Sequence, residues 1–206
     1  MPQIRLTKKC VKKLKIKDPS EPASTMSPFD DWAINLIFIY RKKVAMITHV
    51  KSALTFILPC KQAGGIKGVI ANIAVLLIRW LNENSLTEFI PQVKELFAQP
   101  FVFCKVQDRR ILGIMNDFKR CVGCYRYSNY EDINWDYLSN ITNDIPIDVV
   151  KIWECKSPKG EFFKILNRPQ PQVKQVLSSG LVGFVKTPEN RKIPRLYLSE
   201  DFLKKQ

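Results

Sequence analysis

Apolar residues recur every three or four positions after the Gly64-Gly65 pair, which is the spacing of one buried face of a helix. The pattern covers residues 66–81 and is the strongest helical signal in the chain. Residues 85–88 follow with the spacing of a capping box, which predicts a second helix through Phe97. Pro91 weakens the prediction for the first turns of that helix because proline lacks a backbone donor.

Apolar runs rich in β-branched and aromatic residues predict the strands of a sheet. Residues 32–40 and 44–48 are two such runs, and the basic residues 41–43 separate them, which predicts a β-hairpin. Residues 53–58 form a third run that ends at a proline. We expect a strand there, with a short helix beginning near Ser52 as the alternative.

The chain opens with alternating polar and apolar residues at 3–7, followed by a basic amphipathic segment at 8–14. This order predicts a strand and then a short helix that Thr7 caps. Residues 17–31 hold three prolines with serine and aspartate, so we expect a mobile surface loop. A further strand is predicted at residues 101–106.

The pattern changes after Pro146, where residues 149–155 and 161–166 flank a Ser-Pro-Lys-Gly segment. We interpret them as a second hairpin and residues 149–206 as a small β-rich appendage to a compact domain at 1–148. The predicted fold class is α+β, with a mixed or antiparallel sheet packed against two or three helices.

A buried hairpin must cover its apolar face with the most apolar helix available. We therefore expect one interior, formed by Trp32, Ile34, Leu36, Phe38, Ile73, Leu76, Leu77, Phe89 and Val93.

The charge balance is the first feature that bears on function. The chain carries 33 lysines and arginines against 19 acidic residues, a formal net charge of +14. Such an excess attracts nucleic acid or an acidic protein surface, although a generally basic proteome would also produce it. Residues 1–17 contain no acidic residue, and the lysines of the predicted helix are the first binding candidates: Lys8, Lys9, Lys12 and Lys13.

Six scattered cysteines and the absence of a secretory signal predict a cytoplasmic protein with reduced thiols. The longest apolar run, at 69–81, is interrupted by Asn72 and Arg79 and is shorter than the roughly 20 residues that span a bilayer. We expect no membrane association.

Cys121 and Cys124 form a CxxC pair, which can hold one metal ion or form one disulfide. There is no second such pair and only one histidine, His49, so the ligands for a structural zinc site are missing. We expect inert thiols, no metal and no cofactor. For His49 we expect a hydrogen-bonded structural residue at a strand end, with a base or ligand as the alternative.

A cluster of polar residues of possible function surrounds the apolar segment near Gly113: Asp108, Arg109, Asn116 and Asp117. We expect Asp108 or Asp117 to hold Arg109 in a salt bridge that braces a turn at Gly113; a phosphate or metal site is the alternative. A nuclease hypothesis rests only on short acid-x-Lys patterns such as residues 117–119. No glycine-rich loop with Gly-Lys-Ser/Thr is present.

Residues 119–130 interleave cations with tyrosines, a composition that neutralises phosphates and stacks on bases. The nucleic-acid-binding candidates in this stretch are Lys119, Arg120, Tyr125, Arg126 and Tyr127. The alternative is that these tyrosines fill half-buried positions in an irregular layer.

Residues 5–9, 31–36 and 110–117 resemble a domain of unknown function found in small bacterial and plasmid-borne proteins. Asn143 with Pro146 resembles the ending of that family, and the resemblance spans about residues 2–149. It implies a compact α+β domain, carried by bacteria or mobile elements, with no established activity.

We therefore expect a non-enzymatic basic binding protein, associated with nucleic acid as an accessory or regulatory factor of a bacterium or its mobile element. The alternative is a protein-interaction module, such as an inhibitor, antitoxin or assembly subunit, with an acidic partner. A hydrolase or nuclease is a weaker alternative because a full set of catalytic groups is not evident. The sequence leaves open the choice between DNA and RNA and the oligomeric state.

Overall fold

The computed structural model describes residues 1–24, 27–124, 129–144 and 157–169, and two short strands at 184–186 and 192–194. The chain forms two compact units, Met1–Pro169 and Gln170–Gln206. In the second unit, β6 (Phe184–Lys186) and β7 (Lys192–Pro194) pair in an antiparallel manner. The predicted strand at 149–155 lies outside the described residues.

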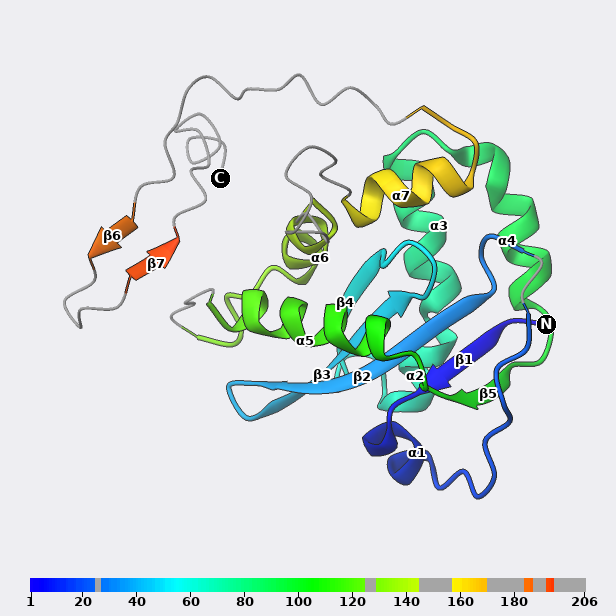
Figure 1. The fold of residues 1–206 in the computed structure, drawn as a ribbon, viewed down its shortest axis with the longest axis horizontal. Helices are drawn as coiled ribbons and strands as arrows, with labels where there is room; N and C mark the ends of the chain where they lie inside the picture. Colours follow the sequence, from blue (N-terminus) through cyan, green and yellow to red (C-terminus); the bar gives the residue numbers. More distant parts are fainter. Residues whose placement is uncertain (25–26, 125–128, 145–156, 170–183, 187–191, 195–206) are drawn as a thin grey trace. The chain divides into compact units, whose positions relative to one another are not determined.

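A five-stranded mixed sheet in the order β4-β3-β2-β1-β5 forms the centre of the first unit (Figure 1). Its strands are β1 (Gln3–Leu6), β2 (Asp31–Ile39), β3 (Lys42–His49), β4 (Thr55–Pro59) and β5 (Val102–Lys105). β1 runs parallel to β2 and β5, whereas the β2–β3 and β3–β4 pairs are antiparallel. The α+β class with a mixed sheet is thus confirmed, and so is the hairpin of β2 and β3.

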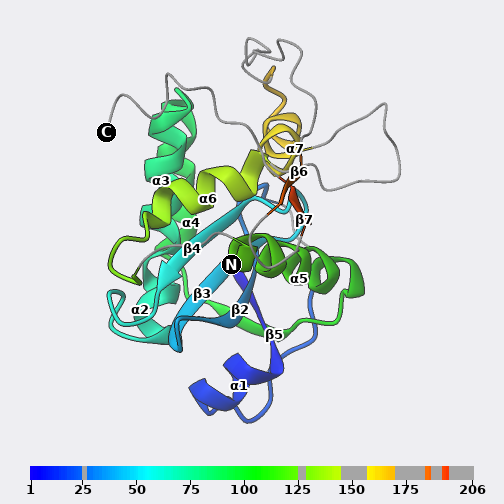
Figure 2. The ribbon, with the colours of Figure 1, turned by 90° about the vertical axis from the view of Figure 1, so that its left-hand side faces the viewer.

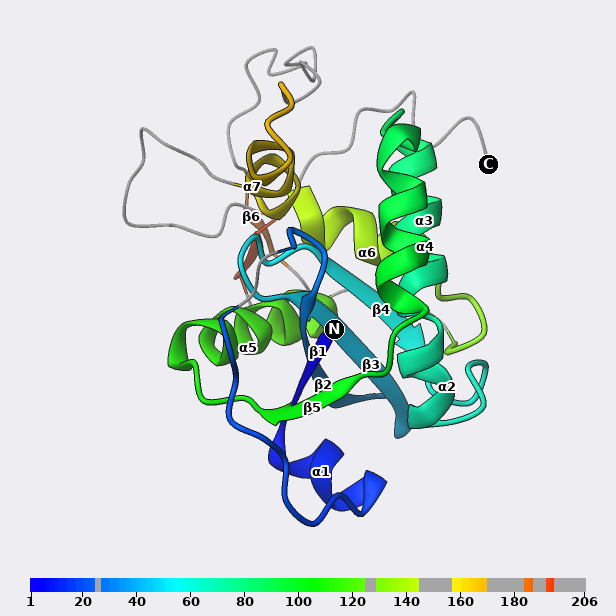
Figure 3. The ribbon, with the colours of Figure 1, turned by 90° about the vertical axis from the view of Figure 1, so that its right-hand side faces the viewer.

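Helices cover both faces of this sheet, since side chains alternate between the two faces along every strand. One core lies against α1 (Lys8–Leu14), α2 (Ile66–Ala71), α3 (Ile73–Glu83), α4 (Ile90–Phe97) and α7 (Pro158–Ile165). A second core lies against α5 (Arg109–Cys124) and α6 (Trp135–Asp144). Figures 2 and 3 show α5 across the sheet from α3 and α4. No helix in the described part of the chain is long and apolar enough to cross a membrane.

The helix predicted over residues 66–81 is two helices that meet at Asn72. The Asn72 side chain donates to the Gly68 carbonyl at 2.7 Å, and a side chain that binds the backbone four residues earlier commonly bends a helix. The capping box at 85–88 does not form. Ser85 has a φ of +58°, and a 3-10 turn, η1 (Thr87–Phe89), precedes α4.

The second hairpin predicted near residue 160 is instead helix α7. The Ser157 side chain accepts a hydrogen bond from the Gly160 N–H at 3.1 Å, and Pro158 occupies the first turn, where its missing donor costs nothing. Phe162 is fully buried in the first core against Phe29 and Trp80. The first unit therefore includes a segment that the sequence pattern places in the appendage.

The predicted interior forms with one exception. Phe38 is 55% exposed because it lies next to the turn of the β2–β3 hairpin, while the other eight residues contribute to the first core. Phe89 is partly buried among them. The second core is not anticipated by the sequence pattern.

Candidate functional site

The predicted polar cluster does not converge on one site. The segment near Gly113 is the helix α5 and not a turn, and the Asp108 carboxylate accepts hydrogen bonds from the backbone N–H groups of Arg110 (2.8 Å) and Ile111 (3.4 Å). Asp117 lies nine residues further on, about 13 Å along the helix axis at 1.5 Å per residue. The two carboxylates therefore cannot share a ligand.

The expected brace on Arg109 is also wrong for the residues that the structure describes. Asp117 pairs with Arg120 at 3.3 Å on the surface, and none of the described ion pairs contains Arg109. Arg109 and Asn116 are both exposed. Because the segment is helical, its hydrogen bonds follow the backbone and need no ionic brace.

Of the CxxC pair, Cys121 has a partly exposed thiol near the end of α5, and the Cys124 side chain lies outside the described part. Within the described ranges, no three histidine, cysteine or acidic side chains cluster as metal ligands do.

His49 is a structural histidine, in agreement with the expectation from sequence. Its ring is fully buried, with Nδ1 2.9 Å from the Ser52 hydroxyl, and it packs against Trp32 and Phe162 at ring-centre distances of 5.1 Å. Burial, reinforced by the charge of Lys51, lowers the pKa of His49 to about 3. The ring is therefore neutral at pH 7 and out of reach of a substrate in solution.

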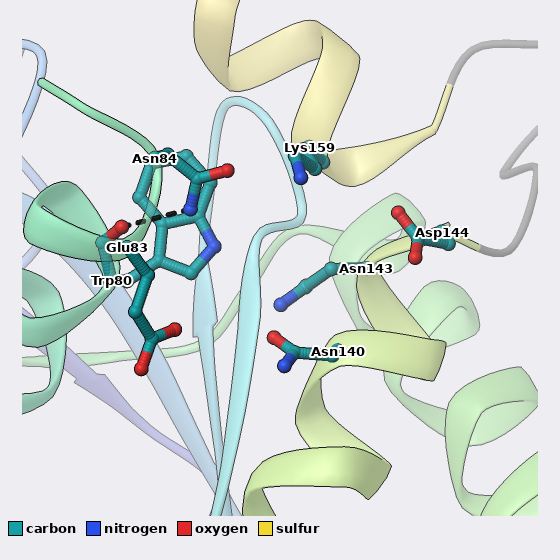
Figure 4. Close-up of a pocket in the computed structure, with 7 residues that line it drawn as sticks. All are labelled: Trp80, Glu83, Asn84, Asn140, Asn143, Asp144 and Lys159. Atoms are coloured by element: carbon teal, nitrogen blue, oxygen red, sulfur yellow. Dashed lines mark hydrogen bonds between the residues drawn. The ribbon is translucent and has the colours of Figure 1, made fainter. Parts of the chain in front are cut away.

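Figure 4 shows a pocket of about 250 Å³ between the end of α3, helix α6 and the start of α7. Its lining is mostly polar: Trp80, Glu83, Asn84, Asn140, Asn143, Asp144 and Lys159. Two of the three amides already have partners, since Asn84 donates to the Trp80 carbonyl at 2.8 Å and Asn143 binds a strand. Burial raises the pKa of Asp144, and the charge of Lys159 opposes that rise.

Asn143 and Ser139 on α6 close the free edge of β4. Asn143 accepts from the Thr55 N–H at 2.6 Å and donates to the Thr55 carbonyl at 2.9 Å, while Ser139 accepts from the Ile57 N–H at 2.9 Å. Pro59, the next position on this side, has no N–H to expose. One residue of the pocket lining, Asn143, thus also protects a sheet edge.

Replacing Asn143 with alanine should lower the free energy of unfolding by about 1–3 kcal/mol, because a buried donor and a buried acceptor of Thr55 lose their partner. Chemical denaturation measures the change. Asn140→Ala, on the exposed side of the same helix, is the matched control and should change stability by less than about 0.5 kcal/mol. Equal effects of the two substitutions would contradict the edge-closing role.

Exposed cations lie on α1, on and before α2, and at the β2–β3 turn; α1 contacts α2, and in Figure 1 the hairpin turn projects to the left of both helices (see also Figures 2 and 3). We call this surface the basic end. Its exposed cations are Lys8, Lys9, Lys12 and Lys13 on α1, Arg41, Lys42 and Lys43 at the hairpin turn, and Lys61 and Lys67 before and within α2. Residues 32–82, like residues 1–17, contain no acidic residue.

Short-range contacts hold these elements together. Helix α1 packs on α2 and β2, and the buried Cys10 thiol donates to the Ile34 carbonyl at 3.3 Å. The Cys60 N–H donates to the Lys43 carbonyl at 3.1 Å, which ties the hairpin to the segment that leads into α2. One of the described ion pairs involves a cation of the basic end: Lys42 pairs with Glu131 at 2.7 Å.

The second predicted binding stretch lies elsewhere. Lys119 and Arg120 are exposed on α5, across the sheet from α1, and residues 125–127 lie outside the described part. The sequence analysis predicts the hairpin but does not assign its turn to a binding surface: Tyr40 is 48% exposed, and Phe38 is not the core residue that its pattern suggests. The signal that could have revealed this surface is the long acid-free stretch around residues 41–43.

Comparison with known proteins adds one match. Residues 3–161 match a family model described as Domain of unknown function (DUF6933). No curated protein and no solved structure matches the chain.

Proposed function

The chain belongs to the DUF6933 family, a domain of unknown function, and we propose that it is a non-enzymatic protein that binds nucleic acid through the basic end. One observation carries this proposal: nine exposed cations on adjoining elements, drawn from two acid-free stretches of the sequence.

The basic end has the properties of a phosphate-binding surface. The lysines of α1 are exposed while Cys10 is buried, so the charges lie on the solvent side of a helix that the core holds in place. Lysine ammonium groups neutralise phosphates without reading sequence, and the counterions that they displace favour binding. We infer binding with little sequence preference, in keeping with an accessory factor of a bacterium or mobile element.

A cytoplasmic location is part of the proposal. Cys10, Cys60 and Cys104 are buried cysteines that form no disulfide. Burial raises the pKa of Cys10, Cys60 and Cys104, so these thiols resist oxidation and suit a reducing compartment.

Replacing Lys8, Lys9, Lys12 and Lys13 with glutamine should weaken binding to all sequences and flatten the dependence of log affinity on log salt. The slope should fall by about 3 if each lysine neutralises one phosphate. Fluorescence anisotropy with labelled oligonucleotides at several salt concentrations measures both effects. Thermal unfolding should stay almost unchanged because the four side chains are exposed.

The matched control is Lys94→Gln with Lys164→Gln, two exposed lysines on α4 and α7 outside the basic end. Its salt slope should equal that of the unmodified protein. An unchanged slope in the α1 variant would remove this helix from the interface. If the unmodified protein binds no nucleic acid even at low salt, the proposal fails and an acidic protein partner becomes the better explanation of the charge.

A further inference from the structure

The turn of the β2–β3 hairpin places two large residues in a backbone conformation that suits glycine. Tyr40 has a φ of +47° and Arg41 a φ of +62°, and they connect the paired residues Ile39 and Lys42. Two-residue hairpin turns with two positive φ values strongly favour Asn-Gly. Bulky residues there are disfavoured, and such strained positions cluster at functional sites.

The same hairpin exposes two aromatic rings among cations. Phe38 is 55% exposed and Tyr40 48% exposed, although rings of this size contribute most when they are buried. Arg41 and Lys43 are exposed beside them. A surface that combines π-faces with positive charge differs from a simple lysine patch, because it can contact bases as well as phosphates.

The register of the hairpin places Phe38 on the α1 side of the sheet. Phe38 pairs with Lys43, two residues beyond the pair of Leu36 and Ala45, whose side chains belong to the first core. Because side chains alternate with a period of two, Phe38 and Lys43 continue that face past the end of the core. Helix α1 packs against the same core, so both groups share a side with its lysines.

The opposite side of the hairpin is anchored. The Lys42 ammonium pairs with Glu131 at 2.7 Å and lies 4.4 Å from the centre of the Tyr130 ring, and Tyr130 packs against Trp135. These contacts hold the strand ends from the α5–α6 side. The face that carries Phe38 lies on the other side of the sheet from these contacts, and Phe38 is 55% exposed there.

We propose that Phe38 and Tyr40 stack on unpaired bases, so that the basic end selects single-stranded nucleic acid over duplex. The inference rests on the proposed function and adds a substrate class to it. Lysine–phosphate contacts form with either kind of strand, whereas the rings reach only bases that are not already stacked inside a helix. Each ring removed should weaken single-strand binding by about tenfold.

The test compares a labelled single-stranded oligonucleotide with the matching duplex, for the unmodified protein and for Phe38→Ala with Tyr40→Ala. We expect single-strand affinity to fall about a hundredfold, about tenfold for each ring, and duplex affinity to change less than about twofold. The salt slope should be retained, because the lysines remain. Phe38→Leu with Tyr40→Leu, which keeps apolar area without a π-face, should lose single-strand affinity as the alanine variant does.

A second variant uses the strain in the turn. Tyr40→Asn with Arg41→Gly supplies the residues that this turn prefers, so it should raise the melting temperature while it weakens single-strand binding. Thermal unfolding and the same anisotropy measurement report the two effects. A rise in stability with unchanged affinity would show that Tyr40 takes no part in binding.

The outcomes separate the two proposals. Equal losses for single strand and duplex, or full affinity in the leucine variant, would overturn the stacking inference while binding by the basic end stands. A protein that binds neither oligonucleotide at low salt would overturn both. Single-strand affinity that falls in the ring variants while duplex affinity and the salt slope are retained would support the inference.

Discussion

Replacing Leu77 with aspartate should lower the free energy of unfolding by about 4 kcal/mol or more. Leu77 lies on α3, has no exposed surface and belongs to the first core. A carboxylate at this position must either lose its hydration without a partner or take up a proton. Urea denaturation at pH 7 measures the loss.

The control for this substitution is Val75→Asp, two residues earlier on the same helix. Val75 is 60% exposed, so an aspartate there stays hydrated, and its effect should be under about 1 kcal/mol. The helix propensity of the new residue is the same in both variants. If Leu77→Asp melted at the same temperature as Val75→Asp, the assignment of α3 to the core would be wrong.

Acidification from pH 6.5 to pH 4.5 should cost about 2 kcal/mol of stability through His49 alone. The pKa of His49 is lowered to about 3 in the folded protein, against a usual value of 6.5. Between these two values His49 is protonated in the unfolded chain and neutral in the folded chain, so the free energy of unfolding falls as the pH falls. The loss begins near pH 6.5 and is complete near pH 3.

His49→Gln isolates this effect, because His49 is the only histidine of the chain. Burial raises the pKa of Asp31 despite its ion pair with Arg5, and a group of that kind makes stability rise on acidification. That contribution is common to both proteins and cancels in the comparison. Denaturation curves at several pH values should show a flatter dependence in the variant, and equal slopes would contradict the buried, neutral ring.

The strands and the first helix could be predicted from sequence because their signals are local. β1, α1 and the β2–β3 pair lie where the alternation of apolar residues and the run at 41–43 place them. β5 also lies within its predicted segment. In each case a pattern of a few neighbouring residues is enough to choose the backbone conformation.

The predictions of a turn near Gly113 and of a hairpin around residue 160 are wrong, because the local sequence of both segments is compatible with a helix as well. Gly113 suggests a turn, yet the chain there is helical and buries Ile111, Ile114 and Met115 in the second core. Phe162 suits a strand or a helix equally well, and its packing against Phe29 and Trp80 decides for the helix. Tertiary contacts therefore override a weak local preference.

The candidate site shows the same division. The acid-free composition and the lysines of α1 are properties of the sequence, and by themselves they predict a nucleic-acid partner. Only the fold brings α2, which carries Lys67, against that helix and ties Lys43 to the segment that leads into α2, because segments far apart in sequence meet through the packing of α1 on α2 and the hydrogen bond between Cys60 and Lys43. Only the fold leaves Phe38 uncovered. The exposure of a ring depends on where the neighbouring helices end, and the local sequence around the ring does not contain this information.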